Sequence, residues 1–409
     1  MICNNLTFRL LVAAIVTCAQ LYTMTRFGRK ASHNVAQDAT SKTQAIMQPR
    51  TTNTAKLRFV KYVSSPWEQQ WIDNIHIYEK DETICEQLLG PDAAILHDFM
   101  KYSCTTTIHG SDWCGINDEV EPIYYNTARL DKFDIRLGGK WLDNLDMSNP
   151  TPVIPSKKMN NIYSYLLFRN DETGELVEDY IEPLVSHLRH PLAGCVGQKP
   201  TISLWTNVYD VLMGQRGYIL PTQHLSSHKT AYKYFDAGAS SWDKGAGGPS
   251  IKFFVKFFQR YGIVFDKIFA FEGNVRPSVF YKSIPDNWKD RIEYQQIYVS
   301  SSKEEDSKES PFLPAVISRS TTTEDYVMFK LDIDSPRVEE GSIDFILANA
   351  KITHIDELFW EHHVKGNYIL ARSHWKKSLR STTRDMTLQQ SYDYFLKMRQ
   401  LGIRAHSWV

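Results

Sequence analysis

The chain has 409 residues, of which 42% are hydrophobic and 23% charged, so it has enough apolar material for a substantial core and for more than one domain. Lys plus Arg and Asp plus Glu both number 47, which gives a formal net charge of zero. Dedicated nucleic-acid-binding proteins usually have a basic excess, so we predict no nucleic-acid partner.

An apolar segment lies close to the N-terminus. Residues 10–24 carry no charge, and this length is slightly below the ~20 residues that span a bilayer. After a short tail, residues 1–7, we interpret residues 8–25 as a signal anchor or a signal peptide. A transit peptide is an alternative, because no Asp or Glu precedes Asp38. The main interpretation predicts a single-pass membrane attachment through this segment, in the secretory pathway or the Golgi, with its orientation left open.

The segment that follows, residues 26–56, is polar and nearly free of aromatic side chains. It cannot bury enough surface to offset the entropy of ordering, so it is predicted to be a disordered stem. Beyond it the chain has four cysteines: Cys85, Cys104, Cys114 and Cys195. Their even number is compatible with two disulfides of undetermined pairing or with four thiols, and the absence of a CxxC motif argues against a cysteine zinc site.

Residues 57–200 are predicted to form an irregular α+β region. The stretch 65–90 indicates short helical pieces, and residues 170–175, "NDETGE", are typical of a turn between two apolar runs. The residues after this turn, 176–195, have apolar side chains near helical spacing, interrupted by two prolines. We find no motif here that indicates a particular chemistry.

Residues 201–409 alternate between strand-like and helix-like patterns. This alternation predicts an α/β fold, with a mostly parallel, Rossmann-like sheet and flanking helices. The predicted strands lie within 201–212, 231–239, 265–272, 291–300, 326–334, 355–363 and 403–409, and the predicted helices are 249–262, 335–350 and 388–402. The first of these helices is apolar nearly all round and should be buried.

Polar residues collect where the predicted strands end. In open α/β sheets, ligands bind outside the carboxyl ends of the strands, near the point where strand order reverses. The first such end begins a glycine-rich stretch, 234–248, and Glu272 ends the next strand, 24 residues after Gly248. Rossmann nucleotide sites place an acidic residue ~20 residues after their glycines, where it binds ribose hydroxyls. The spacing therefore favours a nucleoside ligand, whereas a P-loop is excluded because no GxxxxGK[ST] motif occurs.

The succession "YFDAGA", "FAFE", "VMFKLDID" and "LFWEHH" resembles the strand ends of class I S-adenosylmethionine-dependent methyltransferases, and most closely the FkbM-like group. The resemblance covers about residues 201–409, and several of the same stretches are similar to a group of algal and oomycete-type proteins. It implies a seven-stranded Rossmann-like sheet, S-adenosylmethionine as cofactor, and a hydroxyl or carboxyl acceptor, for example on a glycan. By this resemblance, the cofactor's methionine part would lie at Asp236, Gly238 and Ala239, its ribose at Glu272, its adenine near Ser300 or Ser301, and its sulfonium and the acceptor near Asp332.

Transfer to an alcohol also benefits from a general base. His362, His363 and Asp334 are candidates, because each lies at a predicted strand end. Adjacent residues of a strand point to opposite faces, so only one of the two histidines can face the site, and we choose His362. The glycine-rich turn departs from the family pattern by the insertion "SSWDK", residues 240–244. A methyltransferase fold that binds but does not catalyse is therefore a second hypothesis.

A third hypothesis comes from "KLDID". An Asp-x-Asp motif after an apolar run resembles the metal and nucleotide-sugar motif of Golgi glycosyltransferases, and alternation along a strand would place Asp332 and Asp334 on one face to bind Mn²⁺ or Mg²⁺. The methyltransferase hypothesis explains more of the strand ends. It is the main prediction, with no metal.

Overall fold

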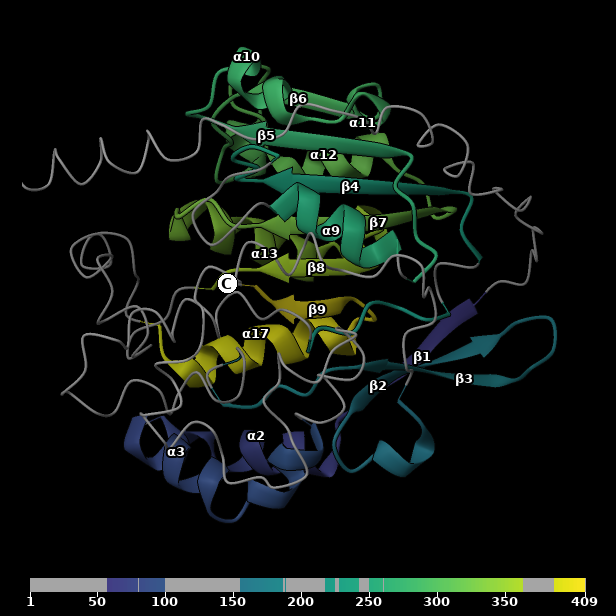
Figure 1. Cartoon of the computed structure of the whole chain (residues 1–409), viewed down its shortest axis with the longest axis vertical. Helices are drawn as coiled ribbons and strands as arrows, with labels where there is room; N and C mark the ends of the chain where they lie inside the picture. Colours follow the sequence, from purple (N-terminus) through teal and green to yellow (C-terminus); the bar gives the residue numbers. More distant parts are fainter. Residues whose placement is uncertain are drawn as a thin grey trace, which may run out of the picture. The chain divides into compact units, whose positions relative to one another are not determined.

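A parallel sheet of six strands forms the centre of the C-terminal half of the computed structural model (Figure 1). The structure describes residues 57–79, 81–99, 155–186, 188, 218–224, 228–242, 250–259, 261–362 and 386–408. In spatial order the strands are β6 (Ile292–Gln296), β5 (Lys267–Glu272), β4 (Ala231–Ala237), β7 (Asp325–Leu331), β8 (Glu357–Trp360) and β9 (Arg404–Ser407), and every neighbouring pair is parallel.

Strand order identifies the type of sheet. Counted along the chain, the order is 3-2-1-4-5-6, the order of a doubly wound Rossmann sheet, and it reverses between β4 and β7. The predicted α/β fold with a parallel sheet is confirmed. Within the described residues this sheet has six strands, whereas the resemblance implies seven. The strand predicted within 201–212 lies outside the described residues.

The central strands are nearly continuous apolar runs. All seven residues of β7, "DYVMFKL", are buried, while the edge strand β6 leaves most of its side chains at least partly exposed. A parallel strand covered by helices on both faces needs this composition, because neither of its faces meets water.

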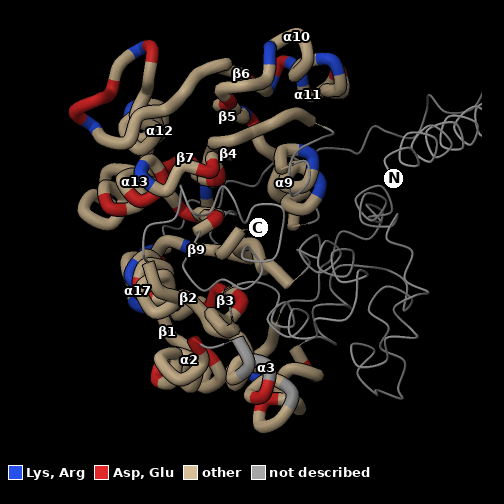
Figure 2. Tube along the Cα trace, turned by 90° about the vertical axis from the view of Figure 1, so that its left-hand side faces the viewer, with Lys and Arg blue, Asp and Glu red and all other residues tan. Residues whose placement is uncertain are grey.

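Helices cover both faces of the sheet (Figure 2). On one face lie α9 (Ser250–Gln259), α10 (Pro277–Phe280) and α11 (Asp286–Lys289); on the other lie α12 (Leu313–Ser320), α13 (Pro336–Ala348) and α17 (Leu388–Gln400). Right-handed crossovers put the helices on opposite faces when the strand order changes direction, so the helices change face where the order reverses. Shorter elements are η4 (Tyr281–Ser283), η5 (Lys303–Glu305) and α14 (Ala350–Thr353).

The three predicted helices of this half are confirmed. α9 is buried along most of its length, as its apolar composition predicts, and the chain after it turns at Gly262, which has φ +76°. α17 begins with a capping box in which Thr387 and Gln390 each accept a hydrogen bond from the other's backbone N–H.

The described part of residues 57–200 contains helices and an antiparallel sheet. The helices are α2 (Pro66–Tyr78), α3 (Asp81–Leu89) and residues 93–99, followed by the short η2 (Lys157–Met159). The sheet has the order β1 (Leu57–Val63), β2 (Ser164–Asn170), β3 (Leu176–Ile181). The helical pieces and the turn at 170–175 are confirmed.

The helical reading of the residues after that turn is wrong for Leu176–Ile181, which form β3. Pairing decides this: β3 lies antiparallel to β2 with Tyr165 opposite Tyr180, and their rings are in edge contact at 5.8 Å. Because β2 immediately precedes this segment, the two can pair as a hairpin, and the pairing provides hydrogen bonds for the backbone of the segment as a strand. These bonds and the cross-strand side-chain contacts outweigh the weak helical spacing of its apolar residues.

The predicted N-terminal segment, 8–25, and stem, 26–56, lie outside the described residues, as do Cys104, Cys114 and Cys195. No helix of the described ranges is long and apolar enough to cross a membrane. The membrane and disulfide predictions stay predictions. The described residues all belong to one compact unit, Thr52–Val409.

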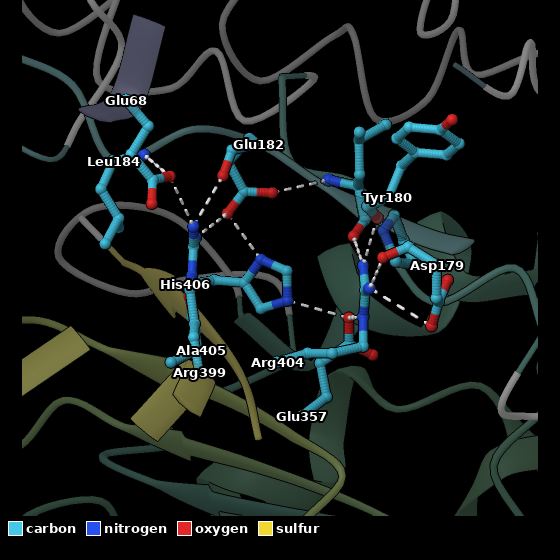
Figure 3. A network of polar contacts seen from close by, with 12 residues as sticks. Glu68, Asp179, Tyr180, Glu182, Leu184, Glu357, Arg399, Arg404, Ala405 and His406 are labelled. Atoms are coloured by element: carbon cyan, nitrogen blue, oxygen red, sulfur yellow. Dashed lines mark hydrogen bonds and ion pairs between the residues drawn. The ribbon is translucent and has the colours of Figure 1, made fainter. Parts of the chain in front are cut away.

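Buried charges join the antiparallel sheet to the parallel sheet (Figure 3). Arg399 of α17 lies 3.2 Å from Glu68 of α2 and 3.6 Å from Glu182. Arg404 of β9 lies 3.3 Å from Asp179 of β3 and 3.3 Å from Glu357 of β8. Both arginine side chains are completely buried. Buried charges of this kind are tolerated only when they are paired and hydrogen-bonded, so each sheet depends on the other for its counter-ions.

His406 completes this network. Its Nδ1 lies 2.7 Å from Glu182 Oε1 and its Nε2 lies 2.9 Å from Glu357 Oε1. Burial by itself would lower the pKa of His406, but the Glu182 carboxylate and the two hydrogen bonds raise it above its usual value. Both ring nitrogens therefore donate, and His406 is the third cation of the network.

Candidate functional site

The candidate site lies at the carboxyl ends of β4 and β7, where the strand order reverses. The backbone N–H of Asp332 donates to the carbonyl of Ala237 at 3.2 Å, so the two strand ends stay in contact one residue beyond the strands. Gly238 has φ +80°, and a Cβ built on it would lie 1.8 Å from the Asp332 carbonyl oxygen. Glycine is required here because the two strand ends approach each other closely. The close approach of a ligand, if one binds, would be a second reason.

Lys330 is the centre of the site. Its side chain is 2% exposed, and its Nζ lies 3.3 Å from Asp236 Oδ1 and 3.0 Å from Asp332 Oδ2. The Gly238 carbonyl accepts a hydrogen bond from the same nitrogen at 2.9 Å. Burial by itself would lower the pKa of Lys330, but the two carboxylates outweigh burial and raise it. The lysine is therefore a cation held between two anions.

Asp236 supports the site from inside the core. It is completely buried, and its Oδ2 accepts hydrogen bonds from Tyr234 (2.5 Å) and from Ser250 at the start of α9 (2.7 Å). The predicted role of Asp236 is direct cofactor binding. The structure instead turns its carboxylate toward Lys330, Tyr234 and Ser250. Ala239, predicted with it, is also fully buried.

Asp332 is the more accessible acid, with a side chain that is 19% exposed. Its Oδ2 also accepts a hydrogen bond from Trp408 Nε1 at 3.1 Å. Burial by itself would raise the pKa of Asp332, but the charge of Lys330 and the hydrogen bonds from Lys330 and Trp408 lower it to about 2. Asp332 is therefore an anion at neutral pH.

Glu272 lies at the neighbouring strand end, as predicted. Its Oε2 accepts the backbone N–H of Ser240 at 3.1 Å, and its Oε1 accepts that of Asn274 at 2.8 Å. A carboxylate has about four acceptor positions, so two remain for a ligand with two hydroxyls. The first contact also ties the loop after β4 to the end of β5.

An aromatic ring lies next to this carboxylate. Tyr298 is 67% exposed, and its hydroxyl donates to the Asn274 side chain at 2.8 Å. A Cβ on Gly273 would lie 2.4 Å from the Tyr298 ring, so the ring packs directly on the backbone that follows Glu272. A flat, exposed ring in this position offers a stacking surface for a base.

Ser300 and Ser301, predicted near the adenine, organise their own loop. Ser300 is buried, its N–H donates to the Pro311 carbonyl at 3.0 Å, and its hydroxyl donates to the Ser302 carbonyl at 3.2 Å. The Ser301 hydroxyl donates to Glu305 at 2.9 Å. Its carbonyl packs on α13, because a Cβ on Gly341 would lie 2.2 Å away.

His362, the predicted base, lies on the face of the sheet that α17 covers. Its Nδ1 is 2.7 Å from the Ser391 hydroxyl of α17, and its ring stacks on Trp360 at 3.9 Å. Trp360 in turn donates to Glu339 of α13 at 3.3 Å.

Asp334 follows the strand in a different conformation from the one predicted. β7 ends at Leu331, and Asp334 has φ +55° and is exposed. The alternation of a strand therefore does not apply to Asp332 and Asp334. No group of three or more His, Cys, Asp or Glu side chains within the described residues is arranged to hold a metal ion.

Three residues of this site were not anticipated from the sequence: Lys330, Trp408 and Tyr298. A lysine two residues before the aspartate that follows the strand, in an otherwise apolar run, was the available signal for Lys330. Trp408 follows the last strand and becomes a neighbour of Asp332 only through the pairing of β9 with β8.

The fold and the site define a doubly wound α/β protein with a charged cluster at its switch point. Comparison with protein-family models, with curated proteins and with solved structures found no match to this chain.

Proposed function

We propose that the chain is an S-adenosylmethionine-dependent methyltransferase acting on a hydroxyl or carboxyl acceptor, for example on a glycan. The observation that carries the proposal is the row of strand ends formed by β5, β4 and β7 around the switch point. The end of β5 holds the Glu272 carboxylate with free acceptor positions beside an exposed aromatic ring, and the end of β7 holds the Lys330–Asp332 pair. Nucleoside ligands of doubly wound sheets bind in this place.

The residues present fit such a cofactor by their chemistry. Glu272 would accept hydrogen bonds from both ribose hydroxyls, and the Tyr298 ring would stack on the adenine in place of the predicted Ser300 or Ser301. Asp332 would face the part of the cofactor that carries positive charge. When bound, S-adenosylmethionine supplies a methyl group that a sulfonium makes electrophilic.

The acceptor's proton is assigned to Asp332. This carboxylate lies at the strand end and is 19% exposed, whereas the His362 ring lies between Trp360 and Ser391 on the face covered by α17. As the acceptor oxygen forms its bond to the methyl carbon, the carbon–sulfur bond would break and the acceptor's O–H proton would pass to Asp332, with S-adenosylhomocysteine as the leaving group. Positioning of the two reactants would supply much of the remaining rate enhancement.

Isothermal titration of the full chain with S-adenosylmethionine and with S-adenosylhomocysteine tests the proposal. We expect both ligands to bind, and Glu272→Ala to weaken both by at least about tenfold, because each charged hydrogen bond contributes ~1.5–3 kcal/mol. Glu293→Ala is the matched control: this carboxylate lies on the adjacent strand in an exposed ion pair with Lys267, and its removal should leave affinity unchanged.

No heat with either ligand would overturn the proposal. Manganese-dependent binding of a nucleotide sugar in the same titration would support a glycosyltransferase instead. Binding of the cofactor without transfer to any tested hydroxyl or carboxyl acceptor would favour a fold that binds without catalysis.

A further inference from the structure

The insertion "SSWDK", residues 240–244, departs from the family pattern, and the structure describes its first three residues. These three residues are held at two points. The backbone of Ser240 is bonded to the end of β5, and the side chain of Trp242 is buried, with 5% of its surface exposed. The described part of the insertion is therefore fixed against the rest of the fold at both of its ends.

The first point is made by the backbone. Three consecutive N–H groups of the loop donate to the end of β5. Those of Gly238 and Ala239 donate to the Phe271 carbonyl at 3.0 and 3.2 Å, and that of Ser240 donates to Glu272 Oε2 at 3.1 Å. Ser240 has φ +50°, a left-handed conformation that is unfavourable for a residue with a Cβ. Contacts elsewhere in the loop must therefore hold it there.

The second point is made by the indole of Trp242. Its ring centroid lies 6.2 Å from that of Trp288 in α11. The Arg291 guanidinium lies over the Trp288 ring at 5.3 Å and donates to the Phe265 carbonyl, just before β5 begins, at 3.0 Å. Trp242 thus anchors the loop on the face of the sheet that α9, α10 and α11 cover (Figure 2). Burial of so large an apolar ring offsets the unfavourable conformation two residues earlier.

Together the two points fix the direction of the Glu272 carboxylate. Ser240 and Asn274 each donate a backbone N–H to one of its oxygens in the ligand-free chain. A side chain with several rotamers loses freedom when a ligand holds it, and this loss weakens binding. A carboxylate that the fold already holds has little such freedom left to lose.

We propose that Trp242 and Ser240 are positioning residues of the nucleoside site: the indole anchors the loop, and the loop's N–H holds Glu272 in the orientation that accepts two hydroxyl groups. The inference rests on the proposed function and deepens it. The insertion then belongs to the binding site and is not a sign of lost activity.

Titration of the full chain with S-adenosylhomocysteine tests the indole. Trp242→Ala should weaken the affinity by roughly two- to tenfold, because binding must then order the Glu272 side chain. Trp242→Phe should retain most of the affinity, since its ring can still pack on Trp288. Phe168→Ala removes a buried ring of β2 and is the control for a loss of stability alone, with unchanged affinity.

The outcomes separate the inference from the proposed function. Unchanged affinity in Trp242→Ala would overturn the inference while leaving the proposed function intact. Absence of binding by the unmodified chain would overturn both.

A double-mutant cycle separates a positioning role from a merely structural one. If Trp242 acts through Glu272, Trp242→Ala should cause no further loss of affinity in a chain that already carries Glu272→Ala. An equal fold-loss with and without the Glu272 carboxylate would show that the indole acts by another route, and would overturn the assignment.

Two variants of Ser240 decide the question if Trp242→Ala does not fold. Asn tolerates the left-handed conformation, whereas a β-branched side chain is strongly disfavoured in it. We expect Ser240→Asn to bind S-adenosylhomocysteine as the unmodified chain does, and Ser240→Val to bind it roughly two- to tenfold more weakly. Equal affinities of the two variants would overturn the inference.

Discussion

Gly238 shows how much a single position at the switch point determines. Its φ of +80° is a conformation that costs a residue with a Cβ about 1–2 kcal/mol, and the nearest atom to such a Cβ would be a backbone oxygen at 1.8 Å. Backbone cannot rotate away as a side chain can. The ends of β4 and β7 would have to separate, and Lys330, which donates to the Gly238 carbonyl, would move with them.

We therefore expect Gly238→Ala to lower the free energy of unfolding by more than about 2 kcal/mol, measured by chemical denaturation. Gly174→Ala is the control, since Gly174 has φ +73° and nothing within 4 Å of a built Cβ. It should show the conformational cost alone, about 1–2 kcal/mol. Equal losses in the two variants would mean that the close approach to Asp332 has no energetic importance.

Arg399 has a comparable importance for the elements around it. The side chain leaves α17 and contacts α2 and the residues after β3, with hydrogen bonds to Tyr62, to the Glu182 carbonyl and to the Ala405 carbonyl. Glu68 has no exposed surface of its own. Removing the arginine would leave buried carboxylates without their cation.

Arg399→Met should therefore lower the free energy of unfolding by about 3–5 kcal/mol. The same change at Arg58, whose ion pair with Asp171 is exposed, should cost at most about 1 kcal/mol. Thermal or denaturant unfolding of both variants checks this, and a small effect at Arg399 would show that the network relaxes or admits water when the cation is removed.

Elements were easier to predict from the sequence than contacts between them. β4, β5, β6, β7, β8 and β9 follow from apolar runs that end in polar residues, and α9, α13 and α17 follow from apolar spacing and end signals. The β3 error arose where a short apolar run fits both periods and only its partner decides between them. The sequence shows β2, the partner strand, as an apolar run, but it does not show that β2 pairs with β3.

The candidate site was predicted only in part, because the sequence indicates where strands end but not which residues become neighbours in space. Asp236, Glu272 and Asp332 stand at strand ends, and any correct assignment of the strands brings these ends to one edge of the sheet. Which way a side chain points depends on its neighbours in space: Ser391 for His362 and Trp408 for Asp332. No periodicity of the sequence carries that information.

At the scale of the molecule, the two halves share one set of charges. Arg399, Arg404 and His406 belong to the C-terminal half, and three of their four carboxylate partners, Glu68, Asp179 and Glu182, come from residues before 201. A boundary at residue 201 separates regions of different composition, but it cuts through a buried network.

We expect a fragment of residues 201–409 not to fold by itself, because its buried cations would retain only Glu357. A fragment of residues 52–409 keeps every member of the network and should fold. Circular dichroism and limited proteolysis of the two fragments provide the comparison. A cooperative unfolding transition in the shorter fragment would show that the halves are energetically independent.

The pairing of Glu68 with Arg399 also has a consequence for how the protein is made. The two residues are 331 positions apart, so a ribosome adding about 5–20 residues per second needs roughly 15–65 s to synthesise the second after the first. During that interval β1, α2 and the β2–β3 hairpin have emerged without the cations that neutralise their acids. Nascent chains of this protein should therefore depend on chaperones for most of their synthesis, and a premature stop near the end should leave the first half without its structure.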